Sequence, residues 1–357
     1  MDVYTRIMHR WKRIILFLLV TRLSEKSFSF CIRPNLLSRQ YTSSSSSSSS
    51  LLFLCETKNL WSVEECLEKQ KAIQFVDGSW YHKGNRNGRL EFVNGPRLPG
   101  AQYFDMSDIS TSKELFPTLN PKGLNVMFPP KSLFAATMDA MNITKDTQVI
   151  LYGRRGSLFL PRIWYMFKTY GQTNVGLMQG SLEDWVEAGG PLDIEPMPFY
   201  PIQAKDLIGK NTINYRVDET ATSQLLTMDQ VLKEIDQNKT NEQEQEQQQR
   251  VLVDTRGSSF SKKGHIPGSK HIPYSSLVES DNSLRLKEKQ ELIKILKEKE
   301  IPKKEPILLS CGSGVSVCHM ALVLEECGYP SPLIYDGSWN EWGSDPETPK
   351  ADGRGQS

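Results

Sequence analysis

Short apolar runs alternate with amphipathic segments along this chain, and the same order occurs twice in succession. The first copy predicts helix 62–70, strand 73–77, helix 131–141, strand 148–152 and helix 161–170. The second copy predicts helix 228–235, strand 251–254, helix 289–299, strand 306–309 and helix 317–327. Short apolar strands that alternate with helices are typical of parallel sheets covered by helices on both faces. We therefore expect an α/β protein with two tandem domains of one fold.

Matching turns support this duplication. The Pro-Gly turn Leu98–Ala101 has a counterpart in Ile266–Ser269, and Gly180–Trp185 has one in Gly337–Trp342. The segments between and around the copies differ in composition, so they set the expected boundaries: domains at 56–190 and 223–345, a Pro-rich and then polar linker at 191–222, a Gln/Glu-rich and disordered surface insertion at 237–249, and a tail at 346–357.

Residues 1–50 are rich in arginine, lysine and serine and poor in acids. Such an N-terminus is typical of a mitochondrial transit peptide, and Ser43–Ser50 is expected to be a flexible spacer. The apolar run Ile14–Val20 also fits a secretory signal, but it is too short to span a bilayer. We predict a mitochondrial location, with a cytoplasmic one as the alternative, and no membrane span.

Charge and composition narrow the function classes. A formal net charge of +1 argues against broad affinity for nucleic acid, so we expect no direct nucleic-acid contact. A hydrophobic content of 38% is that of an ordinary globular protein with enough apolar side chains for two cores. No two cysteines have the CxxC spacing, which argues against zinc binding and thioredoxin-type chemistry. We expect no metal and no cofactor.

One cysteine, Cys311, lies between a predicted buried strand and a predicted helix. The turn that separates them, Gly312–Ser316, is rich in glycine and serine, so no bulky side chain fills it. Its backbone N–H groups and the positive end of the helix dipole favour a thiolate on Cys311, and they would equally hold a persulfide anion. We predict that Cys311 is a nucleophile. The remaining cysteines are expected to be structural or to lie in or beside the leader: Cys31, Cys55, Cys66, Cys318 and Cys327.

The Cys311 loop reads CGSGVS, and it resembles the active-site loop CG(S/T)GVT of the 3-mercaptopyruvate sulfurtransferases, which are rhodanese-type enzymes. Tyr335–Trp342 is similar to the family's YDGSW-x-EW segment. Val253–Arg256, followed by Gly264–Ser269, resembles its VD(S/A)R and GHIPG motifs. The resemblance covers roughly residues 60–345 and implies two tandem rhodanese-like domains. The matching loop of the first copy, Gly153–Ser157, has no cysteine, so only the second domain can carry the sulfur.

The resemblance implies a ping-pong reaction at Cys311. Its thiolate takes the outer sulfur of a small-molecule donor as a persulfide and passes it to a thiol, thioredoxin or cyanide. The residues expected to bind the persulfide through the loop are Gly312, Gly314, Val315 and Val317. Ser313 is the hydroxyl that the family uses for proton handling. Ser316 replaces the usual threonine and joins the candidate catalytic set, although helix capping is its simpler interpretation.

The loop composition also predicts the donor. Relatives that prefer thiosulfate carry Arg-Lys after the cysteine, which suits a dianion, whereas this chain has Gly312 and Ser313. A neutral loop favours 3-mercaptopyruvate over thiosulfate on electrostatic grounds. The family's two carboxylate-binding arginines have no counterpart here, and Lys262, Lys263 and Arg256 are the candidates to supply substrate charge.

Other positions are open to a structural interpretation. Arg256 and Asp254 also fit a supporting pair inside their own domain, and Arg154 and Arg155 in the first copy are interpreted as solvated surface side chains. The family's first-domain Asp and His fall at about Ser107 and Val126, which cannot supply the same relay.

Two alternative functions remain. Gly88–Phe92 resembles a fungal branch that relays sulfur for tRNA wobble-uridine thiolation, which would take its sulfur from a cysteine desulfurase and pass it to a tRNA-thiolation protein. The second alternative is a weakly active rhodanese fold that serves as a binding module. The cysteine in an intact loop argues against that second alternative.

Overall fold

The computed structural model describes residues 58–82, 84–198, 201–211, 214–218, 220–240, 250–280 and 285–352. The predicted leader with its serine tract, residues 241–249 of the predicted insertion, and the tail from residue 353 lie outside the described residues.

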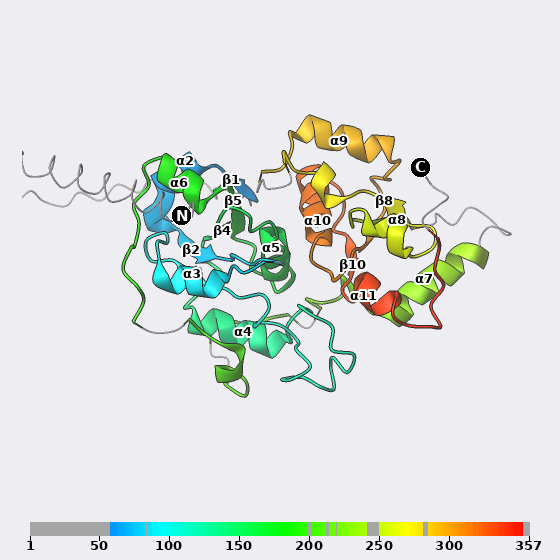
Figure 1. The fold of residues 1–357 in the computed structure, drawn as a ribbon, viewed down its shortest axis with the longest axis horizontal. Helices are drawn as coiled ribbons and strands as arrows, with labels where there is room; N and C mark the ends of the chain where they lie inside the picture. The colour runs from blue at the N-terminus through cyan, green and yellow to red at the C-terminus, as the bar shows by residue number, and fades with distance from the viewer. Residues whose placement is uncertain are drawn as a thin grey trace, which may run out of the picture. The chain divides into compact units, whose positions relative to one another are not determined.

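The first repeat forms a five-stranded sheet in which every pairing is parallel, in the order β1-β5-β4-β2-β3 (Figure 1). Its elements, in chain order, are β1 (Leu60–Trp61), α2 (Val63–Lys69), β2 (Gln74–Asp77), α3 (Gly88–Asn94), β3 (Gln102–Tyr103), α4 (Lys131–Ala140), β4 (Val149–Gly153), α5 (Leu160–Thr169), β5 (Val175–Ser181) and α6 (Leu182–Glu187).

The second repeat forms another parallel five-stranded sheet, in the order β6-β10-β9-β7-β8. Its elements are β6 (Leu225–Leu226), α7 (Met228–Thr240), β7 (Leu252–Asp254), α8 (Ser259–Lys263), β8 (Lys270–His271), α9 (Lys289–Glu298), β9 (Leu308–Ser310), α10 (Val317–Glu326), β10 (Leu333–Tyr335) and α11 (Ser338–Trp342). The two strand orders correspond position by position, which confirms the predicted duplication and the predicted parallel sheets.

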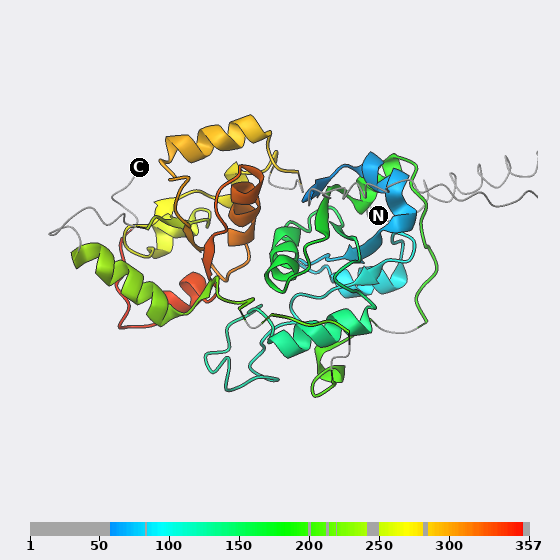
Figure 2. The ribbon, with the colours of Figure 1, turned by 180° about the vertical axis from the view of Figure 1, so that it is seen from behind.

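Helices cover both faces of each sheet, as Figures 1 and 2 show. In the first repeat, α2, α3 and α6 pack on one face through residues such as Cys66, Phe92 and Trp185. In the second repeat, α7 and α11 pack on the corresponding face through Val231 and Trp342. The opposite faces, covered by α4 and α5 in one repeat and by α9 and α10 in the other, belong to one continuous core. The central strands are therefore buried on both sides, which explains their uniformly apolar sequences.

Local sequence explains where several helices begin. The Ser62 hydroxyl accepts a hydrogen bond from the Glu65 N–H, and the Glu65 carboxylate accepts one from the Ser62 N–H, so a capping box starts α2. Ser181 and Asp184 form the equivalent box at the start of α6. The described part of the second repeat lacks a counterpart of the α6 capping box. Its corresponding serine, Ser338, donates its hydroxyl to the Tyr335 carbonyl instead.

The structure also contains elements that the hydrophobic pattern did not predict. The added strands are short or contain glycine and glutamine, so they show little periodicity: β1, β3, β5, β6, β8 and β10. The added α-helices are α3, α6, α8 and α11, each shorter than two full turns. Helix α7 was predicted to end at Ile235 but continues to Thr240, so the first residues of the predicted disordered insertion are helical.

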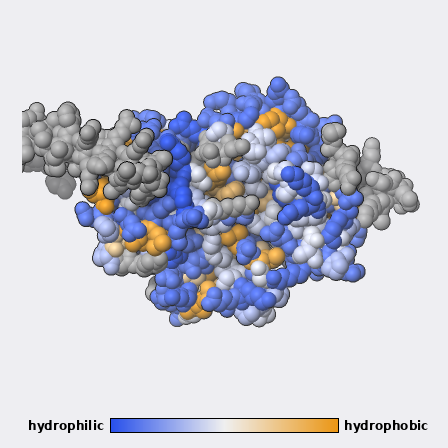
Figure 3. Space-filling model, viewed as in Figure 1, coloured by the Kyte–Doolittle hydropathy of each residue, from blue (hydrophilic) through white to orange (hydrophobic). Residues whose placement is uncertain are grey.

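Apolar areas are small on the face of the described residues that is seen in Figure 1. Figure 3 shows a mostly hydrophilic face with small, separate hydrophobic areas. The large apolar side chains that are exposed lie on different segments of the chain: Leu90, Leu119, Ile194 and Ile208. None of the described helices combines the length and the apolar character that crossing a membrane requires.

Candidate active site around Cys311

Cys311 directly follows β9, one of the central strands of the second sheet, and its side chain is buried. The loop from Gly312 to Ser316 then leads into α10. Two backbone bonds hold the start of this loop, because the Trp339 N–H donates to the Cys311 carbonyl and the Asn340 N–H donates to the Gly312 carbonyl, both at 2.9 Å. The first turn of α11 thus fixes the carbonyl side of the loop.

The hydroxyl of Ser338 fixes the opposite side of the loop. Its Oγ accepts hydrogen bonds from the N–H groups of Cys311 at 3.1 Å and Gly314 at 3.2 Å, and it donates to the Tyr335 carbonyl at 2.8 Å. Ser338 has a left-handed backbone with a φ of 50°, which is uncommon for a residue other than glycine. Its segment marked the family resemblance in the sequence, but nothing in the sequence singled out this hydroxyl.

The remaining amides of the loop point to an anion-binding role. Within the described part of the chain, no hydrogen bond is donated by the N–H groups of Gly312, Ser313, Val315, Ser316 and Val317. Gly314 has a φ of 71°, the left-handed conformation that turns successive amides toward a common point. Since α10 begins at Val317, its dipole adds positive potential at the same place. This arrangement can stabilise a thiolate or a persulfide anion on Cys311.

Ser316 does not cap α10 through its side chain, so the simpler interpretation from the sequence is wrong. Its Oγ lies 3.0 Å from Thr255 Oγ1 and shares a hydrogen bond with it. Ser316 has a helical backbone, and Thr255, which follows β7, supplies the partner of its hydroxyl. Ser313 is partly exposed and makes no hydrogen bond with another described residue.

Arg256, one of the candidates to supply substrate charge, is buried beside the carboxylate of Asp254. Its Nη2 and Nε donate to Asp254 Oδ2 at 2.7 and 2.9 Å, Nε also donates to Asp254 Oδ1 at 3.1 Å, and Nη2 donates to the Gly264 carbonyl at 2.9 Å. It also lies 4.5 Å from the ring centroid of Trp339. These contacts favour the interpretation of Arg256 and Asp254 as a supporting pair inside the second repeat. Lys262 and Lys263, at the end of α8, are exposed and form no ion pair or hydrogen bond with the described loop residues.

Behind the loop, an aromatic group from both repeats surrounds His319 on α10. The His319 ring lies 5.2 Å from the ring of Tyr274 and 5.9 Å from that of Phe159, which precedes α5 of the first repeat. Burial lowers the pKa of His319 to about 4, so this imidazole is neutral at pH 7. A neutral, buried imidazole in this position is part of the packing beneath the loop.

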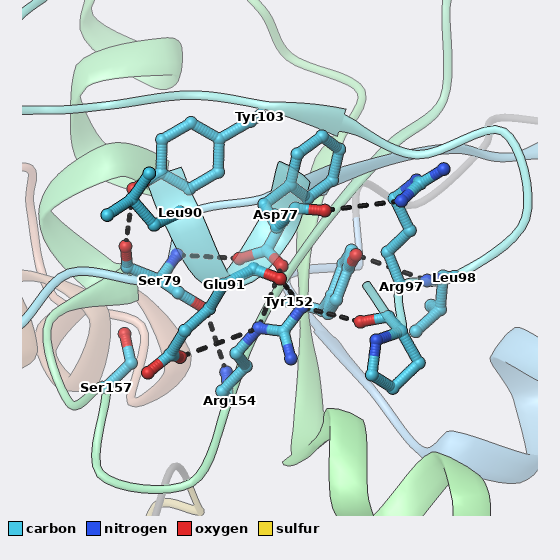
Figure 4. Close-up of polar contacts among 12 residues, drawn as sticks. Asp77, Ser79, Leu90, Glu91, Arg97, Leu98, Tyr103, Tyr152, Arg154 and Ser157 are labelled. Atoms are coloured by element: carbon cyan, nitrogen blue, oxygen red, sulfur yellow. Dashed lines mark hydrogen bonds and ion pairs between the residues drawn. The ribbon is translucent and has the colours of Figure 1, made fainter. Parts of the chain in front are cut away.

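In the corresponding loop of the first repeat, side chains of other segments accept hydrogen bonds from the backbone N–H groups, and the Arg154 N–H donates to Ser79 Oγ at 3.0 Å (Figure 4). By strand register, Asp77 and Tyr152 correspond to Asp254 and Ser310, so Gly153 occupies the position of Cys311. The Arg155 N–H, which would face an anion in the second repeat, instead donates to the Glu183 carboxylate at 2.8 Å.

Arg154 is buried, which corrects its interpretation as a solvated side chain, whereas Arg155 is exposed. The Arg154 guanidinium donates to the carbonyls of Glu91 and Pro96, and its Nε lies 3.8 Å from the Asp77 carboxylate (Figure 4). Burial raises the pKa of Asp77, and the nearby Arg154 charge opposes that rise. In the second repeat the arginine beside the equivalent Asp254 is Arg256, which follows β7. In the first repeat the arginine beside Asp77 is Arg154, which belongs to the loop itself.

Comparison with known proteins places these observations in a family context. The family model described as rhodanese-like domain matches residues 233–345. The thiosulfate sulfurtransferase of Cricetulus griseus is 30% identical over 292 residues, which covers 79% of this chain and 90% of the relative. The Arabidopsis thaliana protein named thiosulfate/3-mercaptopyruvate sulfurtransferase 1, mitochondrial, is 29% identical over 296 residues, or 79% of this chain and 74% of that protein. The crystal structure of SseA from Escherichia coli, described as a 3-mercaptopyruvate sulfotransferase with the rhodanese fold, matches with a TM-score of 0.62 and 25% identity, over 78% of this chain and 98% of that one.

Proposed function

Since the chain belongs to the rhodanese-type thiosulfate/3-mercaptopyruvate sulfurtransferases and is a sulfurtransferase, we propose that Cys311 carries the transferred sulfur as a persulfide. The Cys311 thiolate attacks the outer sulfur of the donor, and the bond between that sulfur and the rest of the donor breaks. With 3-mercaptopyruvate the leaving carbon takes the thiol proton and departs as pyruvate, and with thiosulfate the leaving group is sulfite. The acceptor then attacks the outer sulfur and releases the Cys311 thiolate.

The observation that carries this proposal is the set of free amides around Cys311, which the other described cysteines lack. Burial raises the pKa of Cys66 and that of Cys318 to about 12, so both thiols are protonated at neutral pH. Burial also raises the pKa of Cys327. A protonated thiol is a poor nucleophile, which leaves Cys311 as the sulfur carrier among these residues.

Mass spectrometry after incubation with a sulfur donor tests the assignment. We expect the peptide that contains Cys311 to gain the mass of one sulfur atom, and Cys311→Ser to lower turnover by about a thousandfold or more. Cys66→Ala is the matched control, since it removes a buried thiol on α2 of the first repeat, away from the loop, and should leave the persulfide yield unchanged. Sulfur on another cysteine, or full turnover by Cys311→Ser, would contradict the proposal.

The preferred donor is proposed to be 3-mercaptopyruvate rather than thiosulfate. Arg256 is paired with Asp254, and neither Lys262 nor Lys263 bonds to the described loop. The Arg162 guanidinium, which does bond to the loop, is paired with Asp336, so no unpaired cation is fixed at the described loop to attract a dianion. We expect a higher kcat/KM for 3-mercaptopyruvate than for thiosulfate in steady-state assays. The variant Ser313→Lys places a positive charge in the loop, and it should shift the ratio of the two kcat/KM values toward thiosulfate by about tenfold.

A second candidate function is a protein sulfur relay in which the donor is the persulfide of a cysteine desulfurase. It is favoured by one observation: the described loop has no arginine free to bind the carboxylate of a small keto acid. In this case, a cysteine desulfurase supplied with free cysteine should load sulfur onto Cys311 at a lower donor concentration than 3-mercaptopyruvate does. If 3-mercaptopyruvate loads Cys311 and the desulfurase does not, the relay function is excluded.

The acceptor and the location follow from the family only in general terms. Sulfurtransferases use a sulfur donor and a nucleophilic acceptor, and one of the relatives is named as mitochondrial. We propose a thiol or thioredoxin acceptor, and we propose that residues 1–50 direct the chain to mitochondria. Residues 1–50 fused to a fluorescent protein should accumulate in mitochondria, whereas the chain from Leu60 should remain in the cytoplasm.

A further inference from the structure

Arg162 is a fully buried cation on α5 of the first repeat, and its guanidinium reaches into the second repeat. Its Nη1 donates to the carbonyl of Gly314 at 2.9 Å. Its Nη2 donates to Asp336 Oδ1 at 2.8 Å and to the Val126 carbonyl at 2.6 Å. One planar group therefore joins a carbonyl of its own repeat to two acceptors of the other repeat, one of which lies in the Cys311 loop.

The carboxylate of Asp336 is held from both repeats as well. Asp336 follows β10, and its second oxygen, Oδ2, accepts a hydrogen bond from the Phe128 N–H at 2.8 Å. The Phe128 ring lies 4.0 Å from the centre of the guanidinium and covers it. A buried ion pair costs so much desolvation that well-packed apolar residues often serve stability equally well. The pair is therefore better explained by the geometry that it imposes than by the stability that it adds.

Gly314 is the point at which this ion pair meets the Cys311 loop. A Cβ atom on Gly314 would lie 2.5 Å from Asp336 Oδ1 and 3.1 Å from Arg162 Nη1, so only glycine permits the approach. The Gly314 N–H donates to Ser338 Oγ, which also accepts the Cys311 N–H. Arg162 thus holds the carbonyl of Gly314, while Ser338 holds the N–H groups of Gly314 and Cys311.

The first repeat holds its own acceptor under strain. Val126 has a φ of 52°, which a β-branched residue rarely adopts, and its carbonyl accepts from Arg162. Strained backbone persists where surrounding contacts enforce it, and it is often found beside functional sites. The hydrogen bond from Arg162 is thus one of the contacts that hold Val126 in this conformation.

We propose that Arg162 is a positioning residue for sulfur transfer, through which the cysteine-less first repeat sets the orientation of the loop amides around Cys311. The proposal rests on the assignment of Cys311 as the sulfur carrier. Arg162 is fully buried and does not reach the donor. Its loss should therefore lower kcat, while the KM for the donor stays nearly constant.

Arg162→Lys tests this without leaving Asp336 as an unpaired buried charge. A lysine keeps the charge, but its compact ammonium cannot reproduce the planar set of bonds to Gly314, Asp336 and Val126. The matched control is Lys168→Gln, further along α5, because the Lys168 ammonium forms another ion pair between the repeats, 2.9 Å from Glu325, without touching the loop. Circular dichroism and thermal unfolding show under which conditions every variant is folded, and the assays are run there. If Arg162→Lys does not fold, the neutral double variant Arg162→Gln/Asp336→Asn replaces it as the test.

With 3-mercaptopyruvate or thiosulfate as the donor, we expect Arg162→Lys to lower kcat about tenfold, with less than a twofold change in KM. The Cys311 persulfide of this variant should also decay faster in the absence of an acceptor, since misaligned amides hold the anion less well. Lys168→Gln should stay within twofold of the wild type in all three quantities.

Wild-type kcat in folded Arg162→Lys, an equal loss in Lys168→Gln, or a rise in KM alone would each overturn the inference. Failure of the wild type itself to form a persulfide at Cys311 would instead overturn the proposed function.

Discussion

Three hydrogen bonds of the Ser338 hydroxyl show how a single side chain organises the Cys311 loop. The hydroxyl accepts from the N–H groups of Cys311 and Gly314, and Ser338 adopts a left-handed backbone at the first position of α11. Because both amides are buried, each would be left without a partner if the hydroxyl were removed.

Ser338→Ala should therefore lower both activity and stability. We expect kcat to fall about tenfold to a hundredfold as the loop loses its anchor, and the free energy of unfolding to fall by about 1–3 kcal/mol. Ser344→Ala is the control, because the exposed Ser344 hydroxyl bonds only to carbonyls of the same segment. Equal effects of the two variants in urea denaturation and turnover assays would contradict this role.

The buried imidazole of His319 should make the protein sensitive to acid. Burial lowers its pKa in the folded state to about 4, below the usual value of 6.5, so the unfolded state binds a proton first as the pH falls. Stability is therefore unaffected above about pH 6.5 and declines between that value and pH 4. At pH 5, this one group should cost about 2 kcal/mol relative to pH 8.

Urea denaturation of the wild type and of His319→Gln at pH 8 and pH 5 measures this contribution. The variant has no imidazole to protonate at this position, so it should lose about 2 kcal/mol less than the wild type between the two values. Parallel losses in both proteins would show that other groups account for the acid sensitivity.

At the scale of elements, the same strand–loop–helix unit occurs in both repeats, and contacts made by the loop decide whether it can bind an anion. In the second repeat most loop amides, Gly314 excepted, donate to no other described residue, and Arg256 is held by Asp254. In the first repeat Glu183 occupies a loop amide, and the loop supplies Arg154 to the buried acid network. Restoring a thiol to the first loop should therefore not restore chemistry.

Gly153→Cys combined with Cys311→Ser tests this expectation. A Cβ atom on Gly153 would meet Ser157 Oγ at 3.3 Å, so a small side chain fits there with a minor shift. We expect no more persulfide than with Cys311→Ser alone, measured by mass spectrometry after incubation with 3-mercaptopyruvate. Sulfur loading at position 153 would show that the strand end alone suffices.

At the scale of the whole molecule, the two repeats depend on one another through a shared core. Residues of α4 and α5 belong to the same apolar cluster as residues of α9 and α10. Separating the repeats would expose that cluster to water, which is unfavourable in proportion to its apolar area. The first repeat is therefore needed for folding as well as for the contact that Arg162 makes.

A chain that starts at Leu60 and has segment 241–249 shortened should keep its turnover, because the free energy of closing a connecting segment depends only weakly on its length. Residues 212–357 alone should lose solubility or turnover. Sedimentation and steady-state assays compare both with the full chain. Full turnover by the second repeat alone would contradict both the shared core and the role of Arg162.

The sequence by itself determined the duplicated α/β architecture and the position of Cys311. Both depend on local signals: apolar runs predict the central strands, and a glycine-rich turn between strand and helix predicts an anion-binding loop. The same signals are weak for strands of two residues, so β3 and β8 were found only in the structure.

Tertiary structure decided what each polar side chain contacts. The sequence could not show that Ser316 pairs with Thr255 or that Arg154 is buried. Nor could it show that Arg162 binds Asp336, because these residues lie 174 positions apart. A charged or polar side chain can form its hydrogen bonds with water or with another residue, and the sequence does not tell these cases apart. Only the packing of distant segments excludes the water and brings a particular partner within reach.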